Sequence, residues 1–96
     1  MSEHEQILNK DYLKLRQIRE GKSDIQELAS LYQSHSKNFA DDWLFMLETL
    51  EIIKSKGIQS ELAKSIEKDL LDLAKKDEKK GEVIRDGLAL SHTLVI

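Results

Sequence analysis

Apolar residues recur along this chain with the spacing of α-helices. Near the start of the chain they fall three or four positions apart, at Ile7, Leu8, Tyr12, Leu15 and Ile18. At about 100° per residue these positions share one face of a helix, so a helix is expected from about Glu3 to Glu20. Gly21 follows, and glycine readily adopts the left-handed conformation that ends many helices. The first helix is therefore predicted to end at this glycine.

A second helix is expected to begin at Ser23. Gln26 follows three residues later, which is the spacing of a capping box. Its apolar face comprises Ile25, Leu28, Ala29 and Tyr32. The polar stretch QSHSKN, residues 33–38, should weaken this helix because Ser and Asn side chains compete for backbone hydrogen bonds. This interpretation places His35 in a solvated loop.

The most apolar stretch of the chain is NFADDWLFMLETLEIIKSKG, residues 38–57. A third helix is expected here, capped by Asn38 or Asp41 and ended by Gly57. One stripe of this helix consists of Trp43, Met46, Leu47, Leu50 and Ile53.

Two large side chains of the same helix, Phe45 and Ile52, point almost opposite to that stripe, and Leu44 lies between the two sides. A helix that is apolar on two sides is usually central in its bundle. The alternative is that Leu44, Phe45 and Ile52 form a docking surface for a partner or for a second copy of the chain.

Two more helical segments are expected after Gly57. The fourth helix should run from about Ser60 to Lys76, with an apolar stripe of Leu62, Ala63, Ile66, Leu70, Leu73 and Ala74. Gly81 is expected to break or bend the chain, and a fifth segment begins at about Glu82. The tail HTLVI, residues 92–96, either continues that helix or forms a frayed or extended end.

The composition agrees with a small helical protein. The chain has 96 residues, four glycines and no proline, and it is rich in Leu, Glu, Lys and Ala, which favour helices. A chain of this length forms at most one domain. The predicted fold is therefore all-α, a compact bundle of four or five helices in a single domain, with the third helix central.

Candidate catalytic and metal-binding groups are scattered. The absence of cysteine excludes disulfides and thiolate metal sites, and the segment HEQIL at residues 4–8 has leucine where a zinc helix needs its second histidine. Asp41 and Asp42 are adjacent, so their side chains diverge on a helix and suit capping better than catalysis. We therefore expect no enzyme, metal or cofactor. The open alternative is an enzyme or ligand carrier whose pocket is lined by Tyr32, Trp43 and Met46.

The charge pattern argues against nucleic acid as the main partner. The formal net charge is −3, and acidic residues dilute the most basic stretch, AKKDEKKGE, residues 74–82. A helix-turn-helix regulator remains the alternative function, because Gly57 lies between two predicted helices. In that arrangement Glu61 and Glu67 would face phosphates beside Lys64 and Lys68.

Neither a leader nor a membrane segment is expected. The N-terminus, MSEHEQILNK, is acidic and polar, unlike a secretory signal. No apolar run approaches the roughly 18 residues that are needed to span a bilayer. The expected location is the cytoplasm.

The segments DDWLFMLETLEIIK and EVIRDGLALSH together resemble the C-terminal helical region of long bacterial proteins similar to phenylalanine 4-hydroxylase. The resemblance covers about residues 40–92. It implies an accessory helical module without the iron site, because that site needs two histidines and a glutamate from a catalytic domain absent from these residues. Independently of the resemblance, the absence of a reactive constellation and the surplus apolar surface of the third helix lead us to expect a non-catalytic interaction or accessory module, able to bind another protein or to form a homodimer.

Overall fold

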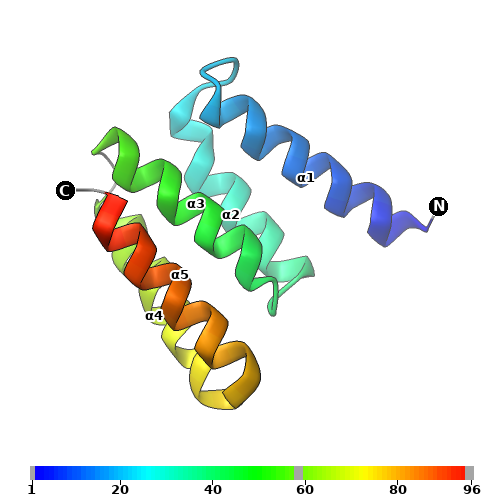
Figure 1. The fold of residues 1–96 in the computed structure, drawn as a ribbon. Helices are drawn as coiled ribbons and strands as arrows, with labels where there is room; N and C mark the ends of the chain where they lie inside the picture. The colour runs from blue at the N-terminus through cyan, green and yellow to red at the C-terminus, as the bar shows by residue number, and fades with distance from the viewer. Residues whose placement is uncertain (1, 58–59, 95–96) are drawn as a thin grey trace. The chain divides into compact units, whose positions relative to one another are not determined.

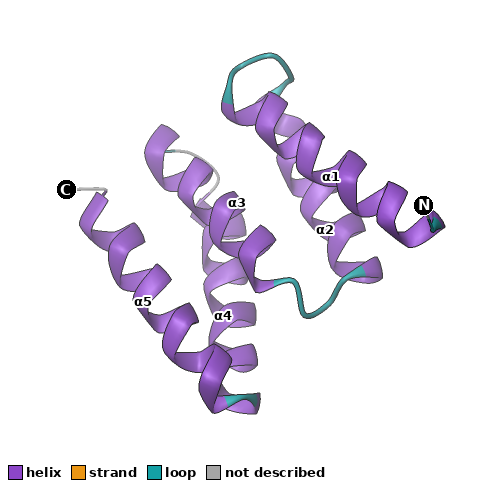
Figure 2. Ribbon diagram, turned by 45° about the vertical axis from the view of Figure 1, so that its right-hand side comes forward, coloured by secondary structure: helices purple, strands orange, loops and turns teal. Residues whose placement is uncertain are grey.

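The computed structural model describes residues 2–57 and 60–94, and these residues are all-α. They form five α-helices and one short 3₁₀ helix, and they contain no strand (Figures 1 and 2). The predicted fold class is thus confirmed. The helices belong to two compact units that meet in sequence between Ala40 and Asp41. The single domain and the central position of the third helix stay predictions.

The first unit is a helical hairpin. Helix α1 (Glu3–Arg19) packs against α2 (Leu28–Asn38), and a turn and the 3₁₀ helix η1 (Ile25–Glu27) join them (Figure 2). The buried residues of these elements are Leu15, Ile18, Leu28, Tyr32 and His35. Gly21 has a φ of +79°, as its predicted role at the end of α1 requires.

Both predicted ends of the second helix need correction. Asp24, and not Ser23, caps this segment: its Oδ1 accepts a hydrogen bond from the Gln26 N–H at 3.0 Å. The helix also continues through Asn38 instead of fading in residues 33–38. The Asn38 side chain donates to the Ser34 carbonyl at 3.2 Å. The Asn38 amide, predicted to compete with the helix for backbone hydrogen bonds, bonds to a carbonyl of the last helical turn instead.

The second unit contains three helices that all contact one another. They are α3 (Trp43–Lys56), α4 (Ser60–Lys76) and α5 (Glu78–Leu94) (Figure 1). The cap of α3 is Asp42, in place of the predicted Asn38 or Asp41, and its Oδ1 accepts from the Phe45 N–H at 3.3 Å. Gly57 ends α3 in the left-handed conformation, and α4 spans the predicted residues.

The prediction that Gly81 breaks the chain is wrong. Helix α5 begins at Glu78 and runs through Gly81 to Leu94, which also makes the tail helical as far as Leu94. Val95 and Ile96 lie outside the described residues. A Cβ atom added at Gly81 would lie only 2.7 Å from the carbonyl oxygen of Ala74. This glycine therefore allows α4 and α5 to approach closely.

The two opposite sides of α3 are both buried. Phe45 is 0% and Ile52 2% exposed, whereas Leu44 is 47% exposed. Thr49, between Phe45 and Ile52 on the same side, is also buried, and its hydroxyl donates to the Phe45 carbonyl at 2.7 Å. The exposed surface considered for Phe45 and Ile52 is therefore absent, because this side of the helix is covered. Of the three candidate interface residues, Leu44 alone lies at the surface.

Candidate functional site

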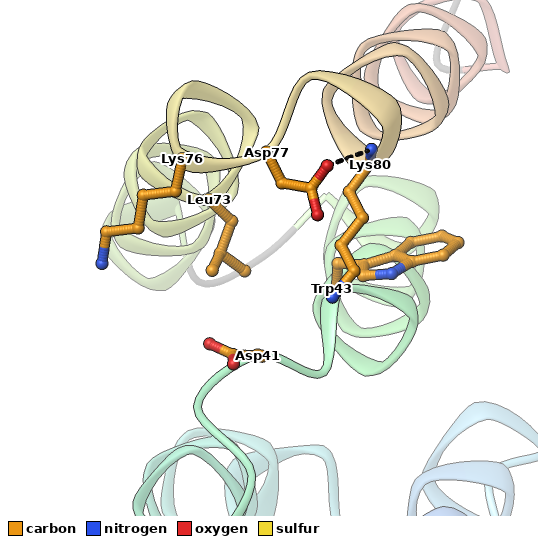
Figure 3. Close-up of a pocket in the computed structure, with 6 residues that line it drawn as sticks. All are labelled: Asp41, Trp43, Leu73, Lys76, Asp77 and Lys80. Atoms are coloured by element: carbon orange, nitrogen blue, oxygen red, sulfur yellow. Dashed lines mark hydrogen bonds between the residues drawn. The ribbon is translucent and has the colours of Figure 1, made fainter.

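A small pocket lies at one end of the second unit, where α4 ends and where α3 and α5 begin (Figure 3). Its volume is about 150 Å³. Six residues line it: Asp41, Trp43, Leu73, Lys76, Asp77 and Lys80. This volume is below the range of about 300–1,000 Å³ that is usual for pockets binding small molecules. It suits a single side chain or a group of similar size.

Local hydrogen bonds hold the Asp77 carboxylate and the backbone of Asp41 at the pocket. Asp77 lies between α4 and α5, and its Oδ1 accepts from the N–H groups of Lys79 and Lys80 at 3.0 and 3.3 Å. Asp41 precedes α3, and its carbonyl accepts from the Trp43 N–H at 2.9 Å. Asp77 therefore completes the first turn of α5, while the Asp41 side chain is exposed beside the pocket.

The acidic groups face the pocket more directly than Lys76 does. In Figure 3 the Leu73 side chain points toward the Asp41 carboxylate, and the Asp77 carboxylate extends toward the start of α5, where it accepts from the Lys80 N–H. The Lys76 side chain extends away from the pocket, and the Lys80 side chain extends toward Trp43. The pocket thus combines two carboxylates with an apolar wall.

Exposed apolar side chains occur close to this pocket in sequence. Leu44, Leu71 and Val83 are 47–48% exposed, one on each helix of the second unit. Leu44 follows Trp43, Leu71 precedes Leu73 by two residues, and Val83 follows Lys80 by three. We call the following set the pocket end of the second unit: the six lining residues together with Leu44, Leu71 and Val83.

The first unit contains a buried polar pair. The His35 ring is 2% exposed, and its Nδ1 lies 2.7 Å from the Asp11 Oδ2, whose side chain is 14% exposed. Because an ionised carboxylate only accepts hydrogen bonds, the Nδ1–H donates to Asp11. Tyr12 meets the His35 ring edge-on at a centroid distance of 5.9 Å, and Phe39 lies against it at 4.8 Å.

This pair corrects the expectation that His35 is solvated. The sequence did carry a signal for its burial, since His35 continues the stripe of Leu28 and Tyr32 at helical spacing. The polar neighbours of His35 concealed that signal. The pair joins α1 to α2 and stabilises their packing in the hairpin.

The other residues singled out in the sequence do not gather into one site. Trp43 lines the pocket, whereas Met46 and Tyr32 are buried and belong to different units. The side chain of His92, the first residue of the tail HTLVI, lies outside the described part of the structure. In the parts of the chain that the structure describes, no three His, Asp or Glu side chains are grouped so as to hold a metal ion.

None of the helices within residues 2–57 and 60–94 has both the length and the apolar character needed to cross a bilayer. Comparison of the chain with protein-family models, with curated proteins and with solved structures gave no match. The residues and their geometry are therefore the basis for a functional proposal.

Proposed function

We propose that this protein is a non-catalytic helical interaction module, and that the pocket end of its second unit contacts the partner. The observation that carries the proposal is the occurrence of Leu44, Leu71 and Val83 within three residues of the pocket lining. Interfaces commonly place apolar anchors beside a few polar groups that fix orientation. The partner is another protein or a second copy of the chain.

The test removes one exposed leucine from each unit. Leu44→Ser should abolish or weaken association, measured by sedimentation over a range of protein concentrations and by co-purification with a cross-linked partner. Its melting temperature should hardly change, since substitutions at exposed sites usually alter stability by about 0.5 kcal/mol or less. Leu13→Ser is the matched control, because Leu13 is 54% exposed but belongs to the first unit.

A strictly monomeric chain that retains no partner dependent on Leu44 would contradict the proposal. Equal losses of association in Leu44→Ser and Leu13→Ser would also contradict it, because they would indicate nonspecific adhesion. Phe45 and Ile52 are unsuitable for this test: both are buried, so their substitution would lower stability before it reported on binding.

The nucleic-acid alternative and the accessory role implied by the hydroxylase resemblance stay predictions. Residues 58–59 of the proposed helix-turn-helix turn lie outside the described part of the chain. Glu67, in the proposed recognition helix, forms an ion pair with Lys54 at 2.8 Å, and Lys64 and Lys68 are exposed. Retention on heparin at low salt that is lost in a Lys64→Ala, Lys68→Ala variant would favour nucleic acid over a protein partner.

A further inference from the structure

We infer that the pocket formed by Asp41, Leu73 and Asp77 receives a lysine or arginine side chain of a protein partner. The inference rests on the proposed interaction function and adds to it the chemistry of the group that is recognised. Its basis is the arrangement of charge and apolar surface in a pocket of about 150 Å³.

The first argument is the direction of the charged groups. The carboxylates of Asp41 and Asp77 both belong to the lining of the pocket, and the amine of Lys76 points away from it (Figure 3). In residues 41–57 and 60–87, neither Lys76 nor Lys80 forms an ion pair with Asp41 or Asp77. An incoming cation would thus meet two carboxylates without first displacing a lysine from either.

The second argument is the apolar wall. The Leu73 side chain lies between the two carboxylates in Figure 3, and Trp43 forms part of the lining. Lysine and arginine carry a charged head on an aliphatic stem, and they bury the stem against apolar surface while the head stays polar. Leu73 and Trp43 offer surface for the stem, and Asp41 and Asp77 offer acceptors for the head.

The third argument concerns the size and the surroundings of the pocket. A volume of about 150 Å³ is small for a separate ligand but sufficient for part of one side chain. Leu44, Leu71 and Val83 are close in sequence to the lining residues and are about half exposed. A partner surface could cover these apolar side chains, whereas a small ion could not. The chain carries a net charge of −3, which also favours a basic partner.

The experiment titrates the full ¹⁵N-labelled chain with single-residue probes and follows its backbone amide signals. The cationic probes are the Nα-acetyl N-methylamides of lysine and arginine. The norleucine compound keeps the stem without the charge, and the glutamate compound carries the opposite charge. Both cationic probes should shift the amides of Trp43, Leu73 and Asp77 saturably, with Kd on the order of millimolar. Higher salt should weaken their binding.

Two variants and one control assign the effect to the pocket. Asp41→Asn should weaken the lysine probe about two- to fivefold, as expected for a partly exposed ion pair. Asp72→Asn makes the same charge change at an exposed position of α4 outside the lining, and it should leave the affinity unchanged. Lys80→Gln removes a positive charge from the lining and should strengthen binding of the lysine probe.

Binding of the glutamate probe as tight as that of the lysine probe would overturn the inference in favour of an anion site on Lys76 and Lys80. Equal binding of norleucine, equal effects of Asp41→Asn and Asp72→Asn, or no saturable shift with any probe would also overturn it. Association that depends on Leu44, in the absence of probe binding, would remove this assignment alone and leave the interaction function standing. Probe binding in the absence of association that depends on Leu44 would keep the pocket's preference for a cationic side chain and remove the interaction function.

Discussion

At the scale of single residues, two of the polar links in the first unit differ in character. The Asp11–His35 pair joins α1 to α2, with the His35 ring 2% exposed. The Lys14–Glu27 ion pair joins α1 to η1 at 2.8 Å, with both side chains more than a third exposed. Since removing one partner from a buried polar group costs more than breaking an exposed ion pair, the two links should contribute unequally.

Asp11→Ala should lower the free energy of unfolding by about 1–3 kcal/mol, because the buried His35 Nδ1–H loses this acceptor. Lys14→Ala, which breaks the exposed pair on the same helix, should cost at most about 1 kcal/mol. Urea denaturation of the two variants, compared at equal m-values, measures the difference. Equal small losses would mean that water replaces the Asp11 carboxylate without cost.

At the scale of elements, two glycines of α5 show how closely the helices of the second unit approach. A Cβ at Gly81 would lie 2.7 Å from the backbone oxygen of Ala74, and one at Gly87 would lie 2.7 Å from Leu47 Cδ1. The first obstacle is the backbone of α4, which cannot move without disturbing that helix. The second is the end of a flexible side chain on α3.

Gly81→Ala should therefore destabilise the protein by about 1–3 kcal/mol, the usual cost of overpacking. Gly87→Ala should change stability by less, about 1 kcal/mol in either direction, because alanine favours a helix and the Leu47 side chain can turn aside. Thermal unfolding of both variants tests this order. A Gly81→Ala variant as stable as the parent would show that α4 and α5 can separate slightly without loss.

The same elements indicate how far the sequence could be interpreted. Helix α4 matched its predicted residues and α1 differed by one residue at its end, because both combine a clear apolar stripe with a terminal signal. Gly81 was misjudged because its effect depends on Ala74 of another helix, which no local pattern records. The pocket was missed for the same reason: Trp43 was singled out, but Leu73 and Asp77 join it only through the packing of three helix ends.

At the scale of the whole molecule, the structure divides the chain into units before and after the Ala40–Asp41 boundary. The units differ in size and in the number of helices that bury each other's apolar faces. Chains of about 55–65 residues can fold alone, but chains of about 40 residues usually need additional links. The first unit has one helix pair and no disulfide to compensate for its size.

A fragment of residues 41–96 should therefore keep its helix content and melt cooperatively, whereas a fragment of residues 1–40 should lose most of its helix content alone. Circular dichroism of the two fragments and of the full chain checks this prediction. It also tests the single-domain prediction, because two fragments that are both unfolded when separate would indicate that the chain folds only as a whole.

The distribution of aromatic residues over the two units has a practical consequence. Tyr12 and Tyr32 lie in the first unit, and Trp43, the chain's single tryptophan, lies in the second. Excitation selective for indole follows Trp43 in the second unit, while the phenol bands of Tyr12 and Tyr32, separated from the overlapping indole absorbance by second-derivative spectra, follow the first unit. One unmodified sample thus carries a separate optical reporter in each half, and divergence of the two signals during heating would reveal the order in which the halves come apart.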